Sequence, residues 1–196
     1  MRIVEGRVRI GVDGADSTEP GAFPSLGAFL EALSSIGKTH DVVLQAFDGS
    51  YVAGPEHLDA AVAHARRAIE RGEAVADEQA VEILLYAAGR RQIDRAMAMG
   101  VGEGEQGVAV VIVGGGEPGE TGDGSKARAR AVTEAAAEAE RGAAAAVDDL
   151  LAPGPVEPDP ERIQSFFDIT DAERRATDAD LEALVVERVA LLDVEK

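Results

Sequence analysis

The sequence contains no cysteine, and only three of its 196 residues are lysine: Lys38, Lys126 and Lys196. Without cysteine, disulfides, thiol nucleophiles and Cys-ligated metal sites are excluded, and this composition is typical of a reducing compartment. With so few lysines, almost all of the 19 basic residues are arginine. Any cationic surface must therefore be built from guanidinium groups.

Long apolar runs are also missing. The longest, Val108–Val113, is far shorter than the ~20 residues that span a bilayer. No long apolar stretch follows Met1–Gly6, so we expect no secretory signal. These absences predict a soluble, cytoplasmic protein.

Acidic residues far outnumber basic ones, and the formal net charge is −18. The carboxylates are spread along the chain instead of forming an acidic tail. Such a diffuse negative surface suits a high-salt cytoplasm, where the Debye length falls to ~3 Å at 1 M salt and self-repulsion costs little. We interpret the charge as a halophilic adaptation and not as a signal for a cationic partner.

Hydrophobic periodicity predicts strands and helices in alternation. Strands are expected at 7–12, 41–47 and 108–113. Helices are expected at 25–36, 54–71, 78–88, 90–99, 126–150, 160–167, 171–175 and 179–194, the seventh opened by a capping box at Thr170–Glu173. This order predicts an α/β fold: a small central sheet of three to five mostly antiparallel or mixed strands, flanked by helices, with a helical C-terminal region.

The length favours a single domain over residues 1–196. Within it, composition predicts two irregular segments. Residues 114–125 form a Gly-rich flexible connector, and residues 151–158 form a Pro-rich linker.

Glycine-rich turns occur twice, but neither fits a nucleotide-binding motif. Gly102–Gly107 matches G-x-G-x-x-G, yet it follows a predicted helix and leads into a strand, the reverse of a dinucleotide site. Gly114–Gly119 follows a strand, but the next helix starts several residues too late. A small nucleotide-binding enzyme that uses these turns is an alternative function.

The remaining chemistry-bearing residues give no catalytic pattern. His57 and His64 lie seven residues apart on one predicted helix, about 10.5 Å along its axis, which is too far for one metal ion to bridge easily. We interpret them as hydrogen-bonded or solvated. No serine stands in a nucleophile-elbow pattern. We therefore expect no catalytic residue, no metal and no cofactor.

Four short stretches occur in a suggestive order. They are Gly54–Leu58 (GPEHL), an Ala-rich helix with Arg66 and Arg67, Glu82–Tyr86 (EILLY), and Arg91–Ile93 (RQI) followed by Gly100. Together they resemble the Cgi-type kinase-binding subunit of the archaeal KEOPS complex, whose animal counterpart is the PRPK-binding protein. The last helix, with Glu-Arg-Val-Ala-Leu-Leu, is also similar. The resemblance covers residues 41–113 well and 158–196 more loosely.

The resemblance implies a non-catalytic accessory subunit with two macromolecular partners. One is the kinase-fold ATPase subunit of KEOPS, and the other is the single-stranded 3′ CCA end of tRNA. The implied process is the threonylcarbamoyladenosine modification of tRNA. The N-terminal loop, the Gly-rich connector and the Ala-rich helix depart from the family pattern.

Six arginines within thirty residues, on two predicted helices, are the candidate RNA contacts: Arg66, Arg67, Arg71, Arg90, Arg91 and Arg95. Guanidinium planes stack on splayed bases and bind phosphates, as a frayed RNA end requires. The alternative is a set of solvated arginines paired with Glu70, Glu73 and Asp94.

The last predicted helix carries apolar residues on two sides. Such a helix is buried on both sides, either within its own domain or against a partner. The residues expected to bind the partner are Leu184, Val185, Arg188 and Leu191. The open alternatives are internal burial and a structural dimerisation module.

Overall fold

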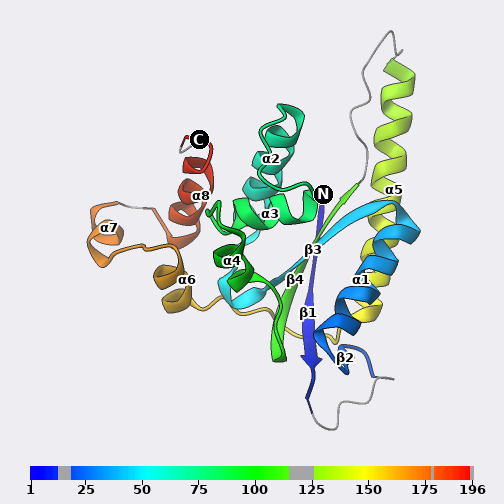
Figure 1. Cartoon of the computed structure of the whole chain (residues 1–196), viewed down its shortest axis with the longest axis horizontal. Helices are drawn as coiled ribbons and strands as arrows, with labels where there is room; N and C mark the ends of the chain where they lie inside the picture. Colours follow the sequence, from blue (N-terminus) through cyan, green and yellow to red (C-terminus); the bar gives the residue numbers. More distant parts are fainter. Residues whose placement is uncertain (13–18, 115–125, 178, 195–196) are drawn as a thin grey trace.

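The computed structural model describes residues 1–12, 19–114, 126–177 and 179–194. Its centre is a sheet of four strands in the order β2-β1-β4-β3 (Figure 1). The strands are β1 Arg2–Ile10, β2 Ala22–Phe23, β3 Val42–Asp48 and β4 Gly104–Gly114. β4 is antiparallel to both β1 and β3, whereas β2 pairs with β1 in parallel. The predicted small mixed sheet is confirmed.

Helices cover both faces of this sheet (Figure 1). On one face lie α1 Leu26–His40 and α5 Lys126–Leu150, which share a buried core with that side of the sheet. The other side carries α2 Pro55–Glu70, α3 Gln79–Ala87, α4 Ile93–Ala96, α6 Pro160–Phe166, α7 Asp171–Ala176 and α8 Leu181–Leu191. Two short 3-10 helices, η1 Gly49–Tyr51 and η2 Met97–Met99, complete the described elements.

β4 is central because its apolar run serves two cores. Val108, Val110 and Ile112 point into the core under α1 and α5. Ala109, Val111 and Val113 point into the larger core under α2, α3 and α8. Alternate side chains of a strand face opposite sides, so a strand covered on both faces reads as a continuous apolar run. The expectation of a doubly covered strand is confirmed.

Helix ends follow local chemistry. The Ser25 hydroxyl accepts from the Ala28 amide (3.2 Å) at the start of α1. Thr170 and Glu173 form the expected capping box at α7. α1 ends at Asp41, which adopts a left-handed conformation (φ 53°).

Three sequence expectations need correction. β1 starts at Arg2 instead of residue 7, because its pairing with β4 continues over Arg2–Gly6. The short strand β2 was missed. The helix expected at 90–99 shrinks to α4 and η2, because Gly89 (φ 57°) ends α3 and leaves Arg90 and Arg91 in a turn.

The two segments expected to be irregular are residues 114–125 and 151–158. All of the connector except Gly114, the last residue of β4, lies outside the described residues. The segment 151–158 has neither helix nor regular strand, but Ala152 forms an isolated bridge with Arg7. Among the helices that the structure describes, none has the length and apolar character needed to cross a bilayer.

Candidate partner and nucleic-acid surfaces

The Gly-Pro-Glu-His segment begins α2, and a distant carboxylate caps it. Gly54 provides no side-chain cap, but Glu182 of α8 accepts from the amide of Glu56 (2.8 Å). A negative group at a helix N-terminus is stabilising, because unpaired amides and the helix dipole meet there. A Cβ on Gly54 would overlap the Glu182 carboxylate, so this close approach explains why glycine precedes the proline.

His57 joins the start of α2 to the end of α3. Its ring is fully buried, with Nε2 2.7 Å from the carbonyl oxygen of Ala87 and Nδ1 3.2 Å from the Ala53 amide. The amide can only donate, so Nδ1 accepts and Nε2 carries the proton that is donated to Ala87. Burial lowers the pKa of His57 to about 4, so the ring is neutral at pH 7. His57 is therefore a structural histidine.

The end of the α8 segment is attached to the third turn of α2. Asp193 Oδ2 lies 2.7 Å from His64 Nδ1, and Asp193 Oδ1 accepts from the Tyr86 hydroxyl (2.5 Å). The rings of His64 and Tyr86 stack with their centroids 5.7 Å apart. Because Glu182 holds the start of α8 to the start of α2, the two helices run side by side in the same direction. Both histidines that the sequence singled out are thus hydrogen-bonded, as expected.

The structure divides five of the six candidate arginines into two groups, and the sixth, Arg95, lies on α4. Arg66, Arg67 and Arg71 lie at the C-terminal end of α2. Arg90 and Arg91 follow the end of α3, which the His57–Ala87 contact places at the N-terminal end of α2. From residue 57 to residue 67, α2 advances about 15 Å at ~1.5 Å per residue. The six arginines are close in sequence, but the packing of α3 against α2 places these two groups at different ends of α2.

Arg90 is engaged within the chain. It donates to the carbonyl oxygen of Phe166 (2.7 Å) and to Asp168 (2.8 Å), and its guanidinium lies 5.8 Å from the centroid of the Phe166 ring. The hydrogen bond from Arg90 lowers the pKa of Asp168, and the charges of Arg95 and Arg188 act in the same direction. Arg67, Arg71, Arg91 and Arg95 are exposed, and Arg66 is half-buried. Among the described residues, no salt bridge joins these five arginines to Glu70 or Asp94.

The four residues expected to bind a partner have different surroundings. Leu184 and Val185 are buried in the chain's own core, which favours the internal-burial alternative for that side of α8. Arg188 donates to Glu173 (2.6 Å) and to the carbonyl oxygen of Phe167 (3.4 Å), so its ion pair lies within the chain. Of the four, only Leu191 is an exposed apolar side chain, at 40% of its surface.

The second apolar side of the last predicted helix, opposite the buried Leu184 and Val185, faces outward in the structure. Ala183, Leu191 and Val194 are exposed, and Val186 and Ala190 are half-buried. Val194 keeps 76% of its surface accessible. We call Val186, Ala190, Leu191 and Val194 the α8 surface.

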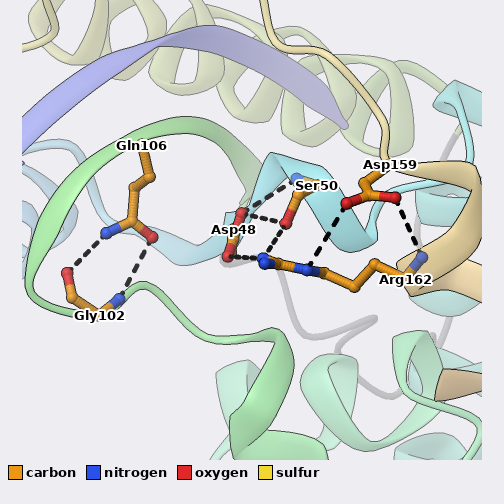
Figure 2. A network of polar contacts seen from close by, with 6 residues as sticks. All are labelled: Asp48, Ser50, Gly102, Gln106, Asp159 and Arg162. Carbon is orange, nitrogen blue, oxygen red and sulfur yellow. Dashed lines mark hydrogen bonds and ion pairs between the residues drawn. The ribbon is translucent and has the colours of Figure 1, made fainter. Parts of the chain in front are cut away.

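A polar network attaches the C-terminal helices to the end of the sheet (Figure 2). Arg162 of α6 donates to the Ser50 hydroxyl (2.9 Å) and lies 3.5 Å from Asp48 Oδ2. The guanidinium also covers the Tyr51 ring, 5.2 Å from its centroid. Asp159 accepts from the Arg162 amide (3.0 Å) at the start of α6. These contacts orient α6 against β3 and η1.

The first glycine-rich turn has its backbone groups occupied. The Gln106 side chain donates to the carbonyl oxygen of Gly102 (2.7 Å) and accepts from the Gly102 amide (3.3 Å), as Figure 2 shows. That amide therefore does not face outward as a phosphate-binding turn requires. The second turn lies outside the described residues after Gly114. Within the described ranges, no three His, Asp or Glu side chains cluster in a way that could hold a metal ion.

The site thus consists of surfaces built on the α2–α3–α8 layer. The sequence model of the family described as kinase binding protein CGI-121 matches residues 28–193. The chain belongs to the CGI-121 family. No curated protein matches the chain.

CGI-121 membership gives the chain a kinase-binding accessory role. Sequence reasoning missed the Glu182 cap, because a first-turn glutamate looks the same whether it caps its own helix or another. The contacts of Asp193 were missed for a similar reason, since a single acid near the C-terminus carries no local signal of its partners.

Proposed function

We propose that the chain is the CGI-121-type accessory subunit of an archaeal KEOPS complex. It binds the kinase-fold ATPase subunit and the 3′ CCA end of tRNA, and it supports threonylcarbamoyladenosine modification without performing chemistry itself. The observation that carries this proposal is the family match over residues 28–193, with its kinase-binding description.

The α8 surface is the proposed kinase-binding site. Its apolar side chains are accessible, and the helix beneath them is held rigidly by the Glu182 and Asp193 contacts. A rigid helix with exposed apolar residues is suited to docking, because little conformational entropy is lost on binding. The buried Leu184 and Val185 support this surface from below and do not contact the kinase.

The kinase interaction is tested by co-purification of the chain with the KEOPS ATPase subunit. We expect the double change Leu191→Glu with Val194→Glu to abolish co-purification, because two buried carboxylates at an interface lack partners. The matched control is Val132→Glu, a change at an exposed apolar residue of α5 (53% accessible). Equal co-purification of all three proteins would contradict the assignment of the α8 surface. Failure of the unaltered chain to bind the ATPase would contradict the function itself.

The proposed RNA contacts are Arg66, Arg67 and Arg71 at the C-terminal end of α2, with Arg91 and Arg95 after α3. The strongly acidic chain repels RNA at long range, so binding depends on short-range contacts from these side chains. Arg90 has a supporting part, since its guanidinium is shared between Phe166 and Asp168.

A gel-shift titration with a CCA-ended tRNA tests these contacts. We expect Arg66→Glu with Arg67→Glu to weaken binding by roughly tenfold or more, because two favourable phosphate contacts become repulsive. The matched control reverses two adjacent exposed arginines of α7, Arg174→Glu with Arg175→Glu. A tRNA that lacks its CCA end should bind weakly to every variant. Equal loss in the control pair would show that only net charge matters.

A further inference from the structure

The outer edge of β3 is open over most of its length. β3 is the last strand of the sheet and pairs with β4 on one side only. On its other side, the bridge between Phe47 and Gly100 is the one pairing found within the described ranges. The stretch Val42–Ala46 therefore presents an edge that main-chain groups of another strand could pair with. Along this stretch, the Gln45 side chain donates to the carbonyl oxygen of Ala46 (2.9 Å).

The opposite edge of the sheet, formed by β2 and β1, is partly paired with other segments of the chain. β2 pairs with the end of β1, and Ala152 exchanges two hydrogen bonds with Arg7 (2.8 and 3.1 Å). Chain segments thus pair with the C-terminal part of β1, from Arg7 to Ile10. The fold can cover a strand edge with its own backbone, and it does so over this part of β1.

β3 also lacks the usual protection of an edge strand. Natural edges are blunted by lysine, proline, bulges or very short strands, because an open edge invites pairing with other chains. β3 has seven residues, contains neither lysine nor proline, and has only Gln45 and Asp48 as polar residues. An unprotected edge of this length is typical of one that receives a strand.

The open edge is the floor of a groove of about 740 Å³. One wall is α1, with Leu30 and Leu33, and the other is formed by α3 and η2, with Val81, Leu84 and Met97. Leu30 and Met97 are 50% and 56% exposed, although both are large apolar side chains. The groove therefore offers apolar side-chain contacts on both faces of the sheet as well as an open backbone edge.

The chemistry of the groove selects its occupant. Its charged lining residues are Lys38, Asp41 and Glu78, in a chain of net charge −18, so a phosphate backbone would be repelled. A helix is about 10 Å wide and pairs its own backbone, whereas a strand needs only ~4.8 Å beside β3. A second copy would bring its own α1 and α3 against these walls, because they flank its β3 in the same way.

We propose that the groove binds an extended segment of a partner polypeptide, which adds to β3 as a fifth strand. Because both walls are apolar, the bound segment carries a run of about five apolar residues. Strands covered on both faces have such runs, whereas strands covered on one face alternate apolar with polar residues. It lacks proline in that run and is not acidic. This mode of recognition combines main-chain pairing for affinity with side-chain contacts for specificity. The proposal does not depend on kinase or tRNA binding.

The test is selection of random dodecapeptides displayed on phage against the full chain. We expect enriched peptides to carry an apolar run without proline, and synthetic copies to bind about tenfold or more weakly to Leu30→Arg and to Met97→Arg. Both positions are exposed, so these variants should fold normally. The matched controls are Ile69→Arg on α2 and Val132→Arg on α5, which change exposed apolar residues away from the groove and should leave binding unchanged.

Hydrogen exchange of the chain with bound peptide supplies the second readout. We expect amides within Val42–Ala46 to exchange about tenfold or more slowly when the peptide is bound, since strand addition protects outward-facing N–H groups. Selection of no groove-dependent peptide, or binding without protection of β3, would overturn the proposal. A dimer of the chain that Leu30→Arg dissociates, or displacement of the peptide by tRNA, would also overturn it.

Discussion

A few residues with distant partners hold the proposed partner surface in place. His57 joins α2 to α3 through the carbonyl oxygen of Ala87, and Glu182 joins α8 to the first amides of α2. Each contact satisfies a buried or terminal polar group that would otherwise lose its hydrogen bond. The energetic roles of the two contacts can be measured separately. The His57 contact depends on the protonation state of the ring, and the Glu182 contact depends on the absence of a side chain at Gly54.

The neutral state of His57 makes stability depend on pH. Its pKa is lowered from 6.5 to about 4 by burial, so below pH 6.5 the unfolded chain binds a proton that the folded chain excludes. The contribution of neutral His57 to the free energy of unfolding is complete above pH 6.5, and it is lost progressively as the pH falls toward 4. We expect the free energy of unfolding of wild type, measured by urea titration relative to His57→Gln, to fall by about 2 kcal/mol between pH 7 and pH 5. A pH-independent difference would contradict this role.

The cap on α2 predicts coupling between Gly54 and Glu182. Gly54→Ala places a methyl group where the carboxylate lies, and Glu182→Ala removes the carboxylate. We expect each single change to lower the free energy of unfolding by about 1–2 kcal/mol, the usual cost of a lost helix cap. The double variant should lose clearly less than the sum, because both changes remove the same interaction. Additive losses would show that the two residues act independently.

At the scale of elements, a few polar contacts add to the core packing that holds the C-terminal helices. α6 is held against the end of β3 by Arg162, and α8 is held along α2 by contacts at both of its ends. The segment 151–158 between α5 and α6 has little regular pairing of its own. The side-chain network in Figure 2 is therefore what positions the start of α6.

Removal of the Arg162 side chain should loosen this attachment. The amide of Asp159 donates to the carbonyl oxygen of Ser50 (3.0 Å) beside the network, so its hydrogen exchange reports local opening. In Arg162→Ala, we expect this amide to exchange about tenfold faster, while amides in β4 keep their rates. Arg174→Ala, on exposed α7, is the matched control. Unchanged exchange at Asp159 would show that backbone contacts alone hold the segment.

At the scale of the whole molecule, the dominant property is the net charge of −18. Salt bridges between described residues involve nine carboxylates, whereas the whole chain carries 37 acidic and 19 basic residues, so the excess carboxylates repel one another through solvent. Self-repulsion destabilises the compact state, and added salt screens it.

The chain should therefore be more stable in high salt. We expect the Tm from thermal unfolding to rise by roughly 5 °C or more between 0.1 M and 1 M KCl, because the Debye length shortens from ~10 Å to ~3 Å. The matched control neutralises three exposed acids with Glu31→Gln, Asp59→Asn and Glu70→Gln, and it should show a smaller rise. An equal rise in both proteins would mean that salt acts through hydrophobic burial and not through charge.

Local patterns predicted most of the secondary structure. The uniform apolar run of β4 and the helical spacing of α1 and α8 mark elements whose side chains are buried in a regular period. The helix α5 was predicted from its high alanine content. The capping box at Thr170 was also visible, since both of its partners lie within one turn. These features depend on residues close together in the chain.

Predictions about surfaces were less complete. The six arginines are close in sequence, yet three lie at the C-terminal end of α2, two follow the end of α3 and one lies on α4. Arg90 is engaged by Phe166 of α6 and by Asp168 after it. Leu184 and Val185 looked like partner contacts, but the chain covers them itself. Which stripe of α8 faces outward depends on where α2 and α3 lie, and this information is not local.

The sequence by itself determined most of the helices and the central strand, the absence of thiol chemistry, the acidic character and the family resemblance, because composition and periodicity are properties of the chain alone. Only the tertiary structure decided the strand order, and with it the open edge of β3 and the groove above it. It also decided that Glu182 caps a helix that starts more than a hundred residues earlier. Such features arise where distant segments meet, and their contacts are chosen by the packing of the whole fold.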